Sequence, residues 1–320
     1  MKYDTCKIVQ NLVQSVYTKY MACGIEDNMD KCIRKAYAKI NLGLDVVRRL
    51  ENGYHEVRMI MQTVGICDVL TLEKTAEGIF VTTDNGELPT DENNLIYKAA
   101  RMMKEKYQID QGVRIHLEKH IPIAAGMAGG STDAAGTFIG MNELFACGAT
   151  EEELRELGVK VGADVPYCIM GGTALAEGIG EILSKLPSPP QCYLLIAKPD
   201  INVSTKYVYE HLDAEGVEVH PDIDGMIGAL KENDLNGIVN RLGNVLENVT
   251  VKKYPVIQQI KDIMLENGAQ GSLMSGSGPT VFGIYTKEET ANATLKVLEE
   301  KQLAKQLFVT GFCQGGTYAG

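Results

Sequence analysis

The stretch PIAAGMAGGSTDAA, residues 122–135, decides how this chain folds and what it binds. A segment of alternating polar and apolar residues precedes it at 113–117, and a run typical of a helix follows at 132–144. Glycines let the backbone approach a ligand closely and turn its N–H groups inward. Ser131 or Thr132 can cap the helix, whose N-terminus carries a partial positive charge. The stretch therefore predicts a phosphate-binding loop between a strand and a helix.

The same residues exclude two common nucleotide-binding motifs. No Gly-Lys-Ser or Gly-Lys-Thr closes the loop, as a Walker A motif requires. The G-x-x-G-G spacing of residues 126–130 also differs from the G-x-G-x-x-G of a dinucleotide-binding fold. The pattern alone leaves one alternative open, an ordinary connection of small residues that ends in a well-capped helix.

The length of 320 residues predicts two domains of about 100–200 residues each. There are 42 acidic residues against 31 basic ones, which gives a formal net charge of −11. Non-specific nucleic-acid binding needs a basic surface, so this balance argues against a nucleic-acid partner. It is compatible with small anionic ligands that are held by backbone N–H groups.

Cysteine usage and hydropathy indicate where such a protein works. The eight cysteines include no Cys-x-x-Cys pair, and the five histidines show no zinc-site spacing. Cysteines spread in this way through a long chain predict reduced thiols and a cytoplasmic protein. No apolar run approaches the ~18–20 residues of a membrane span, so no membrane association is expected.

The N-terminal segment, residues 1–28, has apolar side chains at helical spacing that polar ones interrupt. It lacks the continuous apolar region of a signal peptide. We expect it to be an extension outside the functional core, either an upstream start or a weakly held appendage. A chain of residues 29–320 is then expected to keep full activity.

The pattern along the chain predicts an α+β fold of two domains, because strands and helices mix without strict alternation. Strands at 36–46 and 55–64 flank an Asn-Gly turn signal. The densest proline cluster, at 186–190, marks the expected boundary between an N-terminal domain, 29–186, and a C-terminal domain, 191–320. Further strands are expected at 69–73, 79–83, 113–117, 173–177, 193–198, 271–275, 280–285 and 306–310, and further helices at 95–107, from Thr150 to about 162, and at 205–212, 223–231, 237–247, 254–266 and 287–301.

The glycine-rich stretch resembles the ATP-binding loop of the galactokinase, homoserine kinase, mevalonate kinase and phosphomevalonate kinase (GHMP) superfamily. Three other segments match in order: AYAKINL at 36–42 with NGYHE at 52–56, GADVP at 162–166, and SGSGPT at 275–280. The resemblance runs from about residue 33 to the end. It implies an N-terminal domain like domain 2 of ribosomal protein S5 and a ferredoxin-like α/β C-terminal domain. Two of these segments are most similar to the superfamily's kinases of a cytidyl diphosphate alcohol.

The resemblance implies two catalytic residues. Phosphoryl transfer to a hydroxyl needs charge neutralisation, an aligned nucleophile and a proton acceptor. Asp164 is the implied acceptor, and Lys39 would steady its carboxylate and polarise the attacking hydroxyl or the transferring phosphate. Taken alone, Asp164 could be a turn residue and Lys39 a solvated residue of an edge strand.

The nucleotide side follows from the glycine loop. The resemblance implies that ATP phosphates lie at 126–132, with Ser131 or Thr132 near Mg²⁺. Asp133 would repel the triphosphate unless it points away or reaches the metal, and both possibilities stay open. The implied ATP-binding residues, with the adenine near the first two, are Asn94, Lys119, Pro122, Ala124, Gly126, Ala128, Gly129, Gly130, Ser131 and Thr132.

On the acceptor side, the resemblance implies that a cytosine ring stacks between Tyr54 and Tyr209 and hydrogen-bonds to His55. Stacking with directed hydrogen bonds suits a pyrimidine with an exocyclic amine. Without the resemblance, the Tyr-His pair would be taken as an ordinary junction of turn and strand. The further implied contacts are polar groups of Asn41 and Thr205 and the backbone of Gly276 and Gly278.

These expectations combine into one function, the ATP- and Mg²⁺-dependent phosphorylation of a cytidyl diphosphate alcohol in the non-mevalonate route to isoprenoids. The alternatives are a mevalonate- or homoserine-type kinase and a catalytically silent nucleotide-binding protein. Mevalonate and homoserine contain no nucleobase, so they give no reason for the aromatic residues. The expected partner is a small molecule, and the oligomeric state is left open.

Overall fold

The computed structural model describes residues 30–51, 53–214 and 216–314, so the predicted extension at 1–28 lies outside the described residues. Two long antiparallel strands dominate the fold, β1 (Lys31–Arg49) and β2 (His55–Thr75). The alternating pattern of side chains predicts both, but β2 is one continuous strand where two strands, at 55–64 and 69–73, were expected. Gly65 lies in the middle of β2, where a β-carbon would overlap the hydroxyl of Thr310, so the glycine allows a close crossing instead of ending the strand.

The larger sheet has seven strands, and five of them follow the order β3-β4-β2-β1-β8. β5 pairs with both β2 and β6, and Gly178 and Gly180, both at positive φ, turn the chain between β5 and β6. The bounds of the added strands are β3 (Ile79–Thr83), β4 (Gly112–Glu118), β5 (Thr173–Glu177), β6 (Ile182–Leu186) and β8 (Gly243–Asn244).

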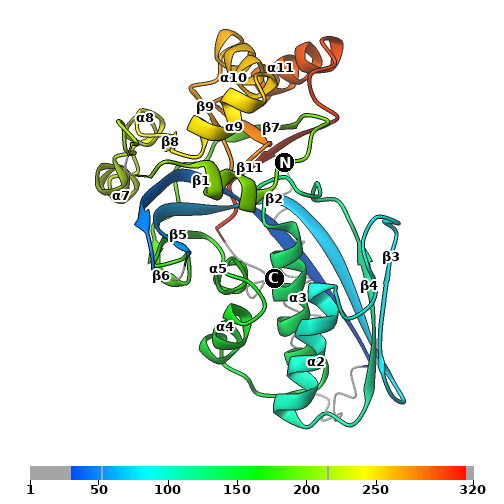
Figure 1. The fold of residues 1–320 in the computed structure, drawn as a ribbon. Helices are drawn as coiled ribbons and strands as arrows, with labels where there is room; N and C mark the ends of the chain where they lie inside the picture. Colours follow the sequence, from blue (N-terminus) through cyan, green and yellow to red (C-terminus); the bar gives the residue numbers. More distant parts are fainter. Residues whose placement is uncertain (1–29, 52, 215, 315–320) are drawn as a thin grey trace, which may run out of the picture. The chain divides into compact units, whose positions relative to one another are not determined.

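Two helices, α2 (Leu95–Tyr107) and α3 (Gly129–Leu144), lie side by side, and α3 packs on β1 and β2 (Figure 1). Small residues of α3 permit this packing: a β-carbon at Gly140 would lie 2.7 Å from Leu72. The helix predicted from Thr150 is present as α4 (Glu151–Val159), and Thr150 and Glu153 form a capping box at its start. The short helix α5 (Val165–Met170) follows.

A smaller, four-stranded sheet has the order β11-β7-β10-β9, and α10 and α11 pack on it (Figure 1). Its core is continuous with that of the larger sheet, since Ile196 and Phe282 belong to the same buried cluster as Ile40. The α+β prediction is confirmed, and the domain limits at 186 and 191 stay a prediction. The bounds are β7 (Tyr193–Lys198), β9 (Gly271–Met274), β10 (Val281–Tyr285), β11 (Gln306–Gly311), α10 (Val256–Glu266) and α11 (Glu288–Glu300).

The segment between β7 and α10 holds four short helices, α6 (Thr205–His211), α7 (Ile223–Lys231), α8 (Leu235–Val239) and α9 (Glu247–Lys253). The helix predicted at 237–247 is wrong. The chain leaves α8, pairs with β1 as β8, and re-enters a helix as α9. Asn244 explains the break, because its side chain donates hydrogen bonds of 2.8 Å to the carbonyls of Met274 and Gly276 and accepts one from the N–H of Leu246.

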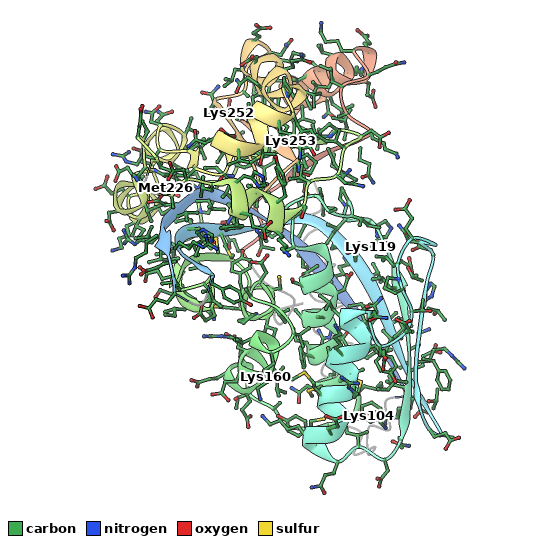
Figure 2. The ribbon with its side chains drawn as sticks, in the orientation of Figure 1. Lys104, Lys119, Lys160, Met226, Lys252 and Lys253 are labelled. Atoms are coloured by element: carbon green, nitrogen blue, oxygen red, sulfur yellow. The ribbon has the colours of Figure 1, made fainter. Side chains whose placement is uncertain are left out.

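The helix α7 packs on β1 at a glycine. A β-carbon at Gly43 would lie 2.7 Å from Ile223 and 3.7 Å from Met226, which Figure 2 labels. This close approach brings α7 against the strand that carries Lys39. The second half of the chain therefore contributes to the surroundings of the predicted catalytic strand.

Candidate active site

A cavity of about 960 Å³ gathers most of the residues that the sequence singles out. Asn41, Thr132 and Gly278 are not among the residues that line it. The predicted residues that do line it are Lys39, Tyr54, His55, Asn94, Lys119, Pro122, Ala124, Gly126, Ala128, Gly129, Gly130, Ser131, Asp164, Thr205, Tyr209 and Gly276.

The glycine-rich loop enters this cavity with an unusual backbone. Ala124 (φ +50°), Gly126 (φ +71°) and Ala128 (φ +58°) all adopt the left-handed conformation. Alanine pays a steric cost in this region, whereas glycine does not. The loop is thus held in a specific, strained path rather than being a flexible connection.

The helix α3 starts earlier than expected and without a side-chain cap. Its N-cap position is Ala128, so the prediction that Ser131 or Thr132 caps it is wrong. The Thr132 hydroxyl is buried and donates a 2.7 Å hydrogen bond to the carbonyl of Tyr37 instead. The first N–H groups of a helix have no partner within it, so an uncapped start at a cavity is suited to an anion. Of the two predicted hydroxyls, Ser131 is the one at the cavity.

The two glycine loops of the chain meet in the wall of the cavity. The Ser275 hydroxyl donates a 2.9 Å hydrogen bond to the carbonyl of Gly126. A β-carbon at Gly276 would lie 2.9 Å from the same oxygen, and one at Gly126 would overlap the Ser275 carbonyl oxygen. This contact of backbone on backbone requires glycine on both sides. It fixes the C-terminal loop against the N-terminal one.

Lys39 and Asp164 face each other, with 3.8 Å between Nζ and Oδ2. Lys39 is only 5% exposed, so the interpretation as a solvated residue is wrong. Its ammonium group donates a 2.9 Å hydrogen bond to Oδ1 of the buried Asn41. Asp164 directly precedes α5, but its side chain makes no capping hydrogen bond. Its carboxylate is therefore available to the cavity.

Aromatic rings occupy another part of the cavity wall. The rings of His55 and Tyr209 lie 5.2 Å apart between centroids, with 39° between their planes. Tyr54 lines the cavity and is 60% exposed. Burial lowers the pKa of His55, and the positive charge of Arg49 lowers it further. A neutral imidazole has one nitrogen that accepts a hydrogen bond and one that donates.

Contacts from the C-terminal half hold α6, which carries Tyr209. The hydroxyls of Thr205 and Ser277 share a hydrogen bond of 2.8 Å. Tyr207 is also on α6, and its ring centroid lies 3.4 Å from the ammonium group of Lys253, the last residue of α9, which Figure 2 labels. Sequence reasoning did not single out Ser277 or Lys253. Their contacts couple the aromatic residue to the C-terminal glycine loop and to α9.

A buried charged cluster lies under the glycine-rich loop. Lys119, labelled in Figure 2, forms ion pairs with Asp68 and, at 3.0 Å, with Asp133. Burial raises the pKa of Asp133 well above its ordinary value. Asp133 is paired with Lys119 and also lines the cavity, so the two possibilities for Asp133 both stay predictions. Asp68 was missed, although a lone acidic residue inside an apolar strand was a signal for it.

Both halves of the chain are similar to a known family of kinases. Residues 94–172 match the N-terminal domain of GHMP kinases, and residues 217–304 match their C-terminal domain. A protein of Lachnospira eligens named 4-diphosphocytidyl-2-C-methyl-D-erythritol kinase is 55% identical over 283 residues, which cover 88% of this chain and 98% of that protein. The chain belongs to the 4-diphosphocytidyl-2-C-methyl-D-erythritol kinase family of GHMP kinases.

Solved structures agree with this family membership. The crystal structure of a 4-(cytidine 5'-diphospho)-2C-methyl-D-erythritol kinase has a TM-score of 0.76 and 30% identity, and the match covers 89% of this chain and all of that one. A homoserine kinase from Cytophaga hutchinsonii has a TM-score of 0.75 at 21% identity, with 92% and 98% of the chains covered, and shares the fold. The resemblance found in the sequence is thus confirmed.

GHMP kinases use ATP as phosphate donor, generally with a divalent metal. Within residues 30–51, 53–214 and 216–314, no group of three or more His, Cys, Asp or Glu side chains could hold a metal ion. Mg²⁺ is commonly bound by one or two protein oxygens together with substrate phosphates and water. The Ser131 hydroxyl, which lies at the cavity, fits such a partial ligand set. Among the described helices, none is long and apolar enough to cross a membrane.

Proposed function

We propose that this protein transfers the γ-phosphate of ATP to the 2-hydroxyl of 4-diphosphocytidyl-2-C-methyl-D-erythritol, giving the 2-phosphate and ADP, in the non-mevalonate route to isoprenoids. One observation carries the proposal: a single cavity holds a lysine–carboxylate pair, an uncapped glycine-rich helix start and a pair of aromatic rings. They supply a proton acceptor, a site for the phosphates and a site that holds the nucleobase and so aligns the acceptor hydroxyl.

In the chemical step, the acceptor oxygen attacks the γ-phosphorus while the bond to the oxygen bridging the β- and γ-phosphates breaks. Asp164 takes the proton of the attacking hydroxyl, and the electron pair of the broken bond leaves with ADP. Lys39 stabilises the negative charge of the carboxylate and of the transferring group. The hydrogen bond to Asn41 aims the Lys39 ammonium group, which gives Asn41 a part in the site from behind the cavity wall.

The phosphates would lie at the N-terminus of α3, where uncapped N–H groups and the helix dipole favour negative charge. Ser131 is the residue that would hold Mg²⁺ together with phosphate oxygens. The ion would supply charge neutralisation at the phosphates. This arrangement explains how a chain of net charge −11 binds two polyphosphate ligands without a basic surface.

For the nucleobase, Tyr54 and Tyr209 offer ring faces, and a neutral His55 can accept a hydrogen bond from an exocyclic amine. A mevalonate- or homoserine-type acceptor has no base to use these groups. A silent nucleotide-binding protein would not need Lys39 and Asp164 facing each other. The six described free cysteines accord with the cytoplasm as the compartment we propose.

The test uses the purified protein with Mg·ATP and each candidate acceptor in turn, with ADP release followed continuously. We expect release with 4-diphosphocytidyl-2-C-methyl-D-erythritol and none above background with mevalonate or homoserine. Release with one of those two would assign the alternative kinase activity. No release with any acceptor, while ADP still binds, would favour the silent protein.

A further inference from the structure

Asp68 is a fully buried carboxylate that contacts the start of the glycine-rich loop. Its Oδ1 accepts hydrogen bonds from the backbone N–H of His120 at 2.6 Å and of Ile121 at 2.8 Å. Its Oδ2 is bonded to the ammonium group of Lys119. One side chain of β2 thus fixes all three residues that lead from β4 into the loop. Asp68 itself is not among the residues that line the cavity.

The same cluster reaches the other end of the loop. Lys119 also donates a 3.0 Å hydrogen bond to Asp133, in the first turns of α3. A β-carbon at Gly129 would lie 2.9 Å from the Lys119 nitrogen, so the ammonium group packs directly against the first residue of that helix. The start and the end of the loop are therefore tied to one buried carboxylate.

The loop between these ends needs such ties. Ala124 and Ala128 both hold left-handed backbone conformations, which persist only where the surroundings impose them. The phosphate-binding N–H groups follow Ala128 directly. Displacement of either end would release the strained residues and turn these groups away from the cavity.

We propose that Asp68 is a positioning residue for the nucleotide, which it never touches. It holds the loop in the conformation that binds the phosphates, through the backbone of His120 and Ile121 and through Lys119. The inference rests on the proposed ATP site. It predicts that loss of the Asp68 charge weakens nucleotide binding and spares the acceptor side of the cavity.

A role in stability alone must be separated from this one, because breaking a buried ion pair destabilises a protein wherever it lies. The test therefore compares the effect of a substitution on nucleotide binding with its effect on the cytidyl substrate. Asp68→Asn keeps an oxygen for the backbone N–H groups and removes the charge that binds Lys119. Glu143→Gln is the matched control, since Glu143 pairs with Arg34 at the opposite end of α3.

ADP binding is measured by calorimetry, and KM is determined for ATP and for the cytidyl substrate. For Asp68→Asn we expect the Kd of ADP and the KM of ATP to rise about 10-fold or more. The KM of the cytidyl substrate and kcat should stay within about twofold of wild type. Glu143→Gln should leave both KM values unchanged.

The inference is overturned if folded Asp68→Asn binds ADP as wild type does, or if both KM values rise equally. A wild-type protein that does not bind ADP would refute the ATP site itself. Should Asp68→Asn fail to fold, hydrogen exchange of the free wild-type protein decides. The amides of His120 and Ile121 must then be protected before any nucleotide is added, and rapid exchange there would overturn the inference.

Discussion

The contact between the two glycine loops allows a sharp test at Gly126. In Gly126→Ala, the new β-carbon would overlap the Ser275 carbonyl oxygen and lie 3.1 and 3.2 Å from the backbone N and O of Gly278. All three neighbours are backbone atoms, so relief requires the loops to separate. The left-handed φ of +71° adds about 1–2 kcal/mol for a residue with a β-carbon. Overpacking adds about 1–3 kcal/mol, which gives a total loss of stability of about 2–5 kcal/mol.

The effect on activity should exceed what this loss of stability explains. A shift of about 1 Å in a site that positions reacting groups lowers the rate about 100-fold, so we expect kcat/KM to fall by that factor. Gly148→Ala is the matched control, because Gly148 has almost the same φ, +70°, with nothing within 4 Å of the new carbon. It should lose only about 1–2 kcal/mol and keep wild-type kcat/KM.

Urea unfolding and steady-state kinetics at saturating ATP measure both quantities. The two variants share the backbone strain, so their difference isolates the overlap with the second loop. If Gly126→Ala matches Gly148→Ala in stability and in kcat/KM, the two loops do not depend on each other and the reasoning fails.

Four further results are expected. Asp164→Asn should lower kcat about 10²–10⁴-fold, and Lys39→Met about 10²–10³-fold, with unfolding midpoints near wild type in thermal scans; near-normal turnover in either would remove it from the mechanism. His55→Ala should raise KM for the cytidyl substrate far more than KM for ATP. Burial and Arg49 lower the pKa of His55 below its ordinary value of 6.5, so its acceptor nitrogen is lost only as pH falls through that lowered pKa. KM for the cytidyl substrate should rise there and stay flat above neutrality, and a rise that already begins above pH 6.5 would contradict the assignment. Residues 29–320 alone should show full turnover, and inactivity after truncation would make the first 28 residues part of the enzyme.

Local chemistry made most of the fold predictable. The helix at Leu95–Tyr107 was predicted with its bounds because it starts at a local signal, a capping asparagine. The Asn94 side chain accepts a hydrogen bond from the N–H of Ile96. The hairpin of β1 and β2 follows from side-chain alternation, and the loop from its glycines. For the site, the resemblance brought together residues that lie more than 100 positions apart, such as Lys39 and Asp164.

The remaining features depend on contacts that a single sequence does not show. Residues 237–247 have helical propensity, but pairing of Gly243 and Asn244 with β1 prevents a continuous helix. Thr132 has the side chain of a cap, yet a β1 carbonyl competes successfully for its hydroxyl. The ties between Asp68 and the loop join segments about 50 residues apart. In each case a tertiary partner outweighs a local preference.

The two-residue strand β8 has a consequence for how this enzyme could be divided. Gly243 and Asn244 pair with β1 at Gly43 and Leu44, a few residues from Lys39. The Asn244 side chain also donates a hydrogen bond to the carbonyl of Gly276. A protein cut within the proline cluster would separate β1, which carries Lys39, from β8, and one glycine loop from the other. Neither fragment would bind or turn over substrate by itself, and reassociation would restore both contacts at once. The chain is therefore a natural scaffold for a split reporter, in which kinase activity signals that two fused partners have met.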